Sequence, residues 1–188
     1  MQNHVSERIF PKFINFKMMK KISLVVLFVA LAATCSLGQG SLGKGGKQLN
    51  AGLGFSSWGV PVYVGLDFGV HESITIGPKV SYRKYTDSYF GNDYSQTLIV
   101  IGFNGNYHFN KLINLDSKWD LYAGLTFGYY LWSDAEINGV TFNGGEGSGV
   151  GIDAQIGARY FFSEKFGINI EFGGGTGTGG SFGITYKL

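Results

Sequence analysis

Apolar and polar residues alternate with a period of two along the last third of the chain. Residues 121–131, LYAGLTFGYYL, place an apolar side chain at every odd position, with small or polar residues and tyrosines between them. The same alternation recurs over residues 150–162, 166–172 and 182–188. Because successive side chains of a β-strand point to opposite faces, this period predicts four strands and excludes helices there.

The same alternation, followed toward the N-terminus, predicts four more strands and gives eight in all. The predicted strands are 49–55, 60–70, 74–85, 99–109, 121–131, 150–162, 166–172 and 182–188. Their connections tend to alternate between long and short, which is typical of an up-and-down outer-membrane barrel with its short turns on the periplasmic side. The connection 110–120 is longer than this rule expects.

Period two alone does not say which face is the outside, because a soluble lipocalin-like barrel also alternates, with its apolar side chains inside. A water-facing surface would carry charges at about a quarter to a third of its positions. The polar face of the predicted strands has few charges and is mainly Gly, Asn, Gln, Ser, Thr and Tyr, which suits a narrow lumen. The apolar face would then meet lipid. The charged positions on the polar face are Asp67, Lys79, Arg83, Asp153, Arg159, Glu171 and Lys187.

These seven charges are four basic and three acidic. We interpret them as a paired network that plugs the lumen, which is a structural role. The alternative is a gated conduit for protons or small ions, in which breaking a pair would open the path.

The chain contains 31 glycines and is 16% aromatic, an unusual mixture for a soluble protein. We expect inward glycines to make room for Tyr63, Tyr122 and Tyr130 to lie across neighbouring strands. Aromatic residues gather near both ends of the predicted strands, as in the girdles of membrane barrels. Pro78 falls inside a predicted strand, where its missing N–H predicts a bulge or an unpaired carbonyl.

Residues 18–38 have the layout of a secretory signal peptide: two lysines, an apolar run and then small residues. We predict cleavage between Gly38 and Gln39, which divides the chain into an extension with a signal peptide (1–38) and a barrel domain (39–188). The true start is open between Met1 and Met18 or Met19. Cys35 would leave with the leader; a lipid-attachment site there is the weaker alternative, because Thr34 precedes it.

Residues 39–188 carry ten Lys or Arg and 12 Asp or Glu, a net charge of −2. The basic balance of the whole chain therefore gives no reason to expect nucleic-acid binding.

Three segments resemble the small outer-membrane β-barrel family of OmpA and OmpX type: GNYHF at 105–109, WDLYAGL at 119–125 and GITYKL at 183–188. The resemblance covers residues 47–188. It implies a closed eight-stranded antiparallel barrel in the outer membrane, with its long loops outside the cell. It implies no particular activity, because that family shares a scaffold and varies in its loops. The chain departs from the family in the glycine run 173–180 and in ending on Leu188, where an aromatic residue is usual.

No set of residues predicts catalysis or a cofactor. His71 falls in a turn, and His108 faces the lumen without a nucleophile in register. Two isolated histidines and no cysteine in residues 39–188 predict no metal site. The glycine run 173–180 lacks the following helix and the lysine of a phosphate-binding loop.

The two longest connections on the outer side are acidic and carry aromatic residues, over residues 86–95 and 133–147. They are either solvated tips or binding surfaces for a partner or for cations. We predict a non-enzymatic protein of the outer membrane, with the membrane lipid as one partner and a structural or surface-interaction role through these loops. The alternatives are a small ion-conducting pore, a soluble ligand-binding barrel, and a lipid-modifying barrel enzyme that recruits Ser88 or Ser133.

Overall fold

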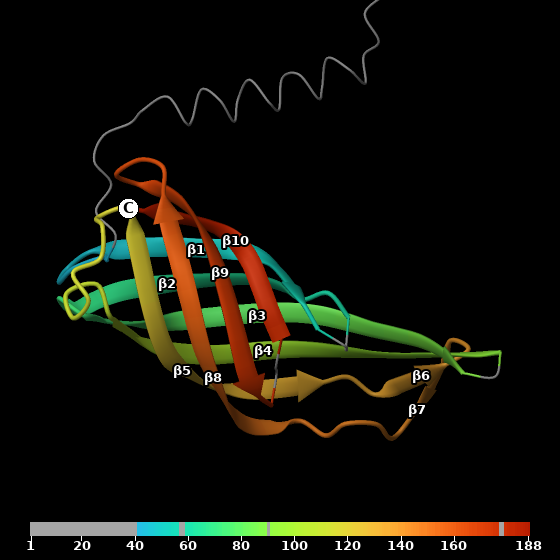
Figure 1. Ribbon diagram of the computed structural model, residues 1–188. Helices are drawn as coiled ribbons and strands as arrows, with labels where there is room; N and C mark the ends of the chain where they lie inside the picture. The colour runs from blue at the N-terminus through green and yellow to red at the C-terminus, as the bar shows by residue number, and fades with distance from the viewer. Residues whose placement is uncertain (1–40, 57–58, 90, 177–178) are drawn as a thin grey trace, which may run out of the picture. The chain divides into compact units, whose positions relative to one another are not determined.

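The computed structural model describes residues 41–56, 59–89, 91–176 and 179–188. The predicted signal peptide and its cleavage site lie outside these ranges. Ten strands form a single antiparallel sheet (Figure 1). They are β1 (Lys47–Phe55), β2 (Val62–His71), β3 (Ile74–Tyr89), β4 (Asn92–His108), β5 (Trp119–Trp132), β6 (Ala135–Ile137), β7 (Val140–Phe142), β8 (Gly149–Phe161), β9 (Phe166–Gly175) and β10 (Gly179–Lys187).

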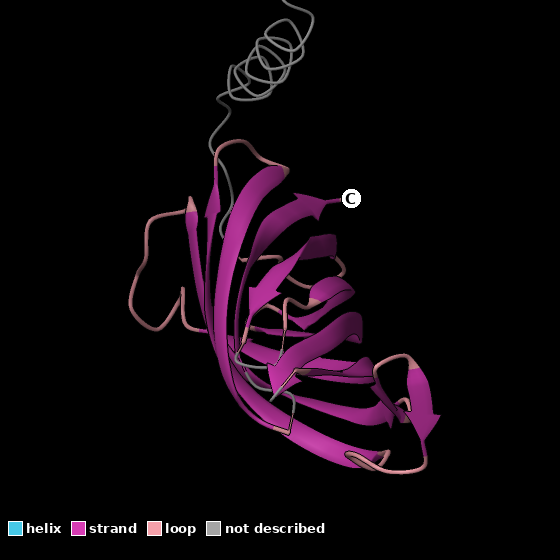
Figure 2. Cartoon of the chain, turned by 90° about the vertical axis from the view of Figure 1, so that its right-hand side faces the viewer, coloured by secondary structure: helices cyan, strands magenta, loops and turns pink. Residues whose placement is uncertain are grey.

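Eight of these strands close into a barrel. Each of them pairs antiparallel with the next barrel strand along the chain, and β1 pairs with β10 to complete the circle. Figure 2 shows the strands curving around a common interior. The predicted eight-stranded up-and-down topology is confirmed. No helix in the described ranges is both long enough and apolar enough to cross a bilayer.

The prediction of the outer connections as loops is wrong in part. β3 continues to Tyr89 and β4 begins at Asn92, so most of 86–98 is paired strand, with Thr86 opposite Ser95. The second connection, 133–147, contains β6 and β7, and β6 pairs with β4. The extension lacks the alternating pattern because a strand beyond the barrel has no apolar surroundings to select one face.

Pro78 does not create the predicted bulge. It pairs in register with Phe103 of β4, and the register shift between β2 and β3 falls instead between Gly69 and His71. On the β2 side the ladder has a gap at Pro78, between the pairs Gly65–Lys79 and Phe68–Ile76. The missing N–H of proline therefore interrupts the pairing with one neighbour without displacing the strand.

The long connection between β4 and β5 lies on the same side as the short turns. The ammonium group of Lys111 in this connection contacts the carboxylate of Glu72 in the β2–β3 turn, which lowers the pKa of Glu72. Asn110 also donates a hydrogen bond to the carbonyl of Trp119, at 2.5 Å, where β5 begins. These contacts hold the connection against the barrel, although it is longer than the short turns expected on this side.

The distribution of polarity is the reverse of that in a soluble protein. Among the described residues, six hydrophobic residues are buried, compared with sixteen polar or charged residues. Large apolar side chains in the middle of strands are exposed, among them Leu125 at 58% and Ile156 at 62%. Since buried polar side chains and large exposed apolar surfaces are both unusual in soluble proteins, the outer face is built for an apolar environment.

Aromatic side chains contact one another at the end of the barrel that carries the short turns. Trp119, Tyr160 and Phe162 are in contact, with ring centroids 4.9 Å apart for the first pair and 5.3 Å for the second. Phe162 stacks on Phe166. At the same end of the barrel, the ring of Tyr107 contacts that of Phe109 edge to face. The predicted girdle on this side is therefore present as contacting rings.

Candidate functional site

The lower half of the lumen, toward the short turns, is organised around Arg159 of β8. Its guanidinium group donates to Asp67 at 2.6 Å and to Asp120 at 3.0 Å. The plane of the guanidinium also lies over the ring of Tyr122, 4.3 Å from the centroid. All three charged side chains are at most 3% exposed.

Amide side chains complete the bonding of these charges. Asn50 and Asn104 each donate to Asp67, at 2.9 and 3.1 Å, and Thr185 donates to Asn50 at 2.8 Å. Because buried charges are tolerated only when they are paired and hydrogen-bonded, this shell of amides is what allows the charges to sit inside the barrel. We call Asp67, Asp120 and Arg159 the inner charge cluster.

Asp120 was not among the predicted lumen charges. The sequence analysis assigned it to a turn, whereas β5 begins one residue earlier, at Trp119. The signal that could have found it is the period of two, because Asp120 is two residues before the inward Tyr122.

His108 has a hydroxyl partner that the sequence analysis did not foresee. Its Nδ1 lies 2.7 Å from Asp120, and its Nε2 lies 2.9 Å from the hydroxyl of Thr75. This is the order of contacts found in a nucleophile–histidine–acid triad. A hydroxyl group is therefore hydrogen-bonded to His108, and the prediction that His108 has no nucleophile in register stays a prediction. All three side chains are nevertheless buried to at least 98%.

The upper half of the lumen contains a second ion pair. Lys79 of β3 bonds to Glu171 of β9 at 2.5 Å, and the hydroxyl of Tyr122 donates to the other oxygen of Glu171 at 3.1 Å. The ring of Tyr63 lies beside the Lys79 ammonium group, 5.2 Å away, and its hydroxyl donates to Asn169 at 2.6 Å. Glu171 thus links β9 to both β3 and β5 across the lumen.

The remaining predicted charges, Arg83, Asp153 and Lys187, have other contacts. Arg83 donates to the hydroxyl of Ser56 at 3.1 Å, and Asp153 accepts from the hydroxyl of Tyr130. Lys187, at the turn side, lies over the ring of Phe161, 4.0 Å from its centroid. The seven predicted positions thus make contacts at different depths of the lumen, and Tyr122 contacts both Arg159 and Glu171.

Three tyrosines cover glycines on other strands: Tyr122 and Tyr130 on the adjacent strand β8, and Tyr63 on β10, which lies beyond β1. A Cβ atom added to Gly157 would lie 2.2 Å from the ring of Tyr122, and one added to Gly151 would lie 2.6 Å from Tyr130. At Gly183 the hydroxyl of Tyr63 would be 2.6 Å away. The expectation that inward glycines make room for these rings is confirmed.

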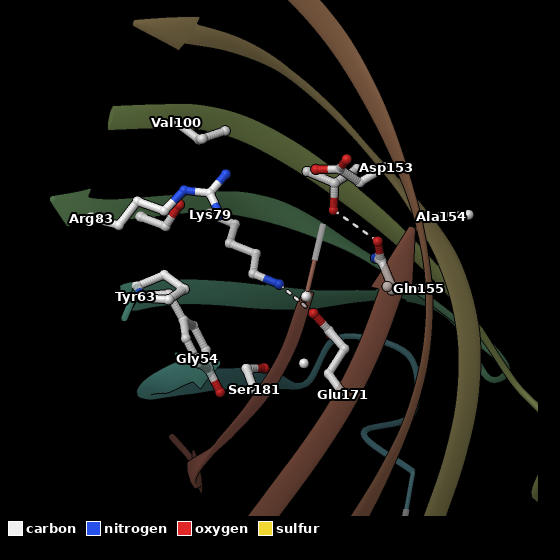
Figure 3. A pocket seen from close by; sticks show the side chains of 16 residues that line it. Gly54, Tyr63, Lys79, Arg83, Val100, Asp153, Ala154, Gln155, Glu171 and Ser181 are labelled. Atoms are coloured by element: carbon white, nitrogen blue, oxygen red, sulfur yellow. Dashed lines mark hydrogen bonds and ion pairs between the residues drawn. The ribbon is translucent and has the colours of Figure 1, made fainter. Parts of the chain in front are cut away.

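The lumen is open on its outer side and narrow below. A wide mouth of about 480 Å³ lies at the outer rim, and a polar cavity of about 100 Å³ lies in the outer half of the barrel (Figure 3). The residual space between Lys79, Tyr122 and Arg159 is only about 20 Å³. We call the 100 Å³ cavity the vestibule; Arg83 and Gly179 line both this cavity and the mouth.

The second candidate site is the sheet that β3, β4, β6 and β7 form beyond the barrel, seen at the far right of Figure 1. Gln96 fixes it by donating from Nε2 to the carbonyls of Ser133 and Glu146, at 2.9 and 3.2 Å. Three large apolar side chains are exposed on its outermost hairpin: Ile137, Val140 and Phe142. We call this element the outer sheet.

The acidic residues of the outer sheet are held by neighbouring hydroxyls. Asp87 accepts from Tyr85 at 2.8 Å, Asp93 from Ser88 at 2.5 Å, and Glu136 from Ser95 at 3.3 Å. Within the described ranges, no three His, Cys, Asp or Glu side chains are grouped as a metal site requires. These contacts order the strands and give no support to cation binding.

No family model matches the chain, and no curated protein matches it in sequence. Among solved structures, the N-terminal β-barrel domain of OprF from Pseudomonas aeruginosa is similar with a TM-score of 0.51 and 13% identity, over 78% of this chain and 99% of that one. Ail, the attachment invasion locus protein of Yersinia pestis, gives a TM-score of 0.45 at 12% identity, over 77% and 99%. A de novo designed transmembrane β-barrel gives 0.48 at 16%, over 77% and 97%. The likeness to the OprF domain shows a shared fold.

Proposed function

We propose that this chain, which has the fold of the small outer-membrane β-barrels, anchors the outer sheet at the cell surface and acts through it by non-enzymatic contact with a partner. The observation that carries this proposal is the continuation of β3 and β4 beyond the barrel, with β6 and β7 paired alongside them. Such an extension contributes nothing to closing the barrel. It does place an ordered surface away from the membrane.

The exposed apolar face supports a membrane location. Side chains such as Leu125, Phe127 and Ile156 are each more than half exposed in the middle of β5 and β8. Hydrocarbon solvates such side chains, and the closed barrel leaves no backbone group unpaired at a sheet edge within it. The chain therefore meets the two physical requirements for spanning a bilayer with strands.

The direction of the strands supports an outward position for the outer sheet. β1 begins and β10 ends on the side of the short turns, opposite the outer sheet. In outer-membrane barrels with an even number of strands, both ends of the barrel lie in the periplasm. The outer sheet would then face the cell exterior.

The outer sheet has the features of a docking surface. β7 is the last strand in the sheet order of the described residues, so one of its edges is unpaired there. An exposed edge with apolar side chains can accept another strand by backbone hydrogen bonding. Asp134, Glu136 and Glu146 make this region acidic, which favours a partner segment that carries basic residues.

Removal of residues 133–147 tests the proposed surface role. We expect cells that express the shortened protein to lose adhesion conferred by the full chain, while the barrel keeps its heat-modifiable mobility on gels. A matched control is Leu112→Ser, which removes an apolar side chain exposed at 72% on the opposite end. Unchanged adhesion after the deletion, with the protein correctly inserted, would contradict the proposed surface role.

The same geometry argues against the pore alternative. The inner charge cluster leaves about 20 Å³ of space where a conduit would have to pass. We expect the purified protein to leave a planar bilayer closed, both as it is and as Arg159→Ala. A steady conductance of the unmodified protein would favour the pore.

A further inference from the structure

The vestibule is lined by charged and polar side chains from strands on all sides of the lumen. Lys79, Arg83, Asp153, Glu171 and Ser181 point into it (Figure 3). Arg83 lines both the vestibule and the wider mouth above it. A solute in the mouth could therefore reach this guanidinium group, although the mouth is also lined by the acidic Glu146.

Arg83 makes little use of its hydrogen-bonding capacity. Its side chain is buried, with only 7% of the residue exposed, and within the described ranges it makes one hydrogen bond, to Ser56. A guanidinium group carries five N–H donors in a planar fork that matches carboxylate and phosphate oxygens. The other four donors have no acceptor among the described residues. Arg159, the other arginine of residues 39–188, is by contrast bound to two carboxylates.

Other unused donors face the same space. The hydroxyl of Ser181 is buried without a hydrogen-bond partner of normal geometry in the described part of the chain. Lys79 has three donors, of which its bond to Glu171 takes one. Both carboxylates of the vestibule already accept hydrogen bonds. Glu171 accepts from Lys79 and Tyr122, and Asp153 accepts from Tyr130. The vestibule therefore contains donors that a ligand with acceptor oxygens could satisfy.

We propose that the vestibule binds a small solute through one anionic group, a carboxylate or a phosphate, which the fork of Arg83 holds with help from the hydroxyl of Ser181. The volume of about 100 Å³ admits the anionic head of such a solute. The mouth, with Tyr130 and Trp132 in its wall, leaves room for the remainder of the molecule. This inference concerns the lumen and does not depend on the role proposed for the outer sheet.

Arginine side-chain NMR tests the proposal directly. Residues 39–188 contain two arginines, so their Nε–H signals give a reporter in the vestibule and an internal reference in the inner charge cluster. The protein is held in a non-ionic maltoside micelle, because a phosphocholine detergent would itself present a phosphate. Inorganic phosphate is titrated in one arm and acetate in the other, each against chloride at equal ionic strength.

We expect the Arg83 signal to shift saturably with at least one of the two anions, and the Arg159 signal to stay in place. Ser181→Ala should weaken binding about fivefold, the equivalent of one neutral hydrogen bond. The same variant removes only a hydroxyl group, and heat-modifiable mobility on gels should show that it folds like the unmodified protein. Arg83→Lys keeps the charge without the fork, and should weaken binding roughly tenfold or more.

Lys84→Gln is the matched control, since it removes a positive charge from the neighbouring residue, which faces outward and is exposed. Its affinity should equal that of the unmodified protein. Shifts that do not saturate, that match those in chloride, or that move both arginine signals alike would overturn the proposal. So would an affinity that falls as much in Lys84→Gln as in Arg83→Lys.

Discussion

Arg159 lies between the carboxylates of Asp67 and Asp120 in a part of the lumen from which water is largely excluded. Its position follows from register, because Asp120 faces Arg159 directly across the β5–β8 pair. Asp67 reaches it from β2, on another part of the wall. Such a cluster is stable only as a whole, because removing one member leaves the others charged and buried.

Arg159→Met should therefore destabilise the folded barrel by about 3–5 kcal/mol, as expected when one partner of a buried ion pair is removed. Urea unfolding in lipid vesicles, followed by tryptophan fluorescence, would measure the free energy of unfolding. Lys84→Met is the control, because that side chain is exposed on the outer face. A loss for Arg159→Met no larger than for the control would show that the cluster is not coupled in this way.

Gly157 and Gly149 offer a matched pair within β8. A side chain at Gly157 would overlap the ring of Tyr122, whereas nothing lies within 4 Å of a Cβ atom at Gly149. We expect Gly157→Ala to cost about 1–3 kcal/mol by overpacking, and Gly149→Ala to change the free energy of unfolding little. Equal effects of the two variants, in the same unfolding assay, would contradict the cross-strand packing of Tyr122.

The orientation of individual side chains could be predicted from the sequence, but their partners could not. Period two assigns Asp67, Arg83 and Arg159 to the lumen without reference to other strands. Which charges meet depends on the stagger between strands around the barrel, and this is not encoded in any one segment. For this reason the sequence does not reveal that Arg159 donates to two carboxylates while Arg83 donates to the hydroxyl of Ser56.

At the scale of strands, alternation is strong where a strand has lipid on one side and the lumen on the other. β5 and β8 meet this condition along most of their length and were predicted within two residues of their observed ends. The outer halves of β3 and β4 do not meet it, because both of their faces lie beyond the barrel. Their pairing, from Lys84 opposite Thr97 to Tyr89 opposite Asn92, could not be read from periodicity.

The apolar face of the strands can be tested by placing a charge on it. Ile156→Lys puts an amine in the middle of β8 at a position that is 62% exposed. We expect a loss of about 2–4 kcal/mol in unfolding from lipid vesicles, the cost of a lysine near the bilayer midplane. Val140→Lys, at 58% exposure on the outer sheet, should cost close to nothing. Similar small effects for both variants would mean that β8 does not contact hydrocarbon.

At the scale of the whole molecule, the two faces of the barrel wall differ in polarity, and little space remains in the lower lumen. Its wall is apolar outside and polar inside, its lower lumen is filled by the inner charge cluster, and its outer end carries a sheet with a free edge. The closed barrel could be predicted because eight alternating segments with few inward charges admit few other folds. The outer sheet and the vestibule arise from strand extension and stagger, so they required the structure.

Site-directed spin labelling tests the central claim that hydrocarbon surrounds the barrel wall. The described residues contain no cysteine, so Ile156→Cys and Thr141→Cys each introduce a single labelling position there. In lipid vesicles, we expect the label at residue 156 to collide with oxygen, which concentrates in hydrocarbon, and to be shielded from a water-soluble nickel complex. The label at residue 141, on β7, should show the reverse. If the label at residue 156 is as accessible to the nickel complex as the label at residue 141, the barrel wall faces water and the account is wrong.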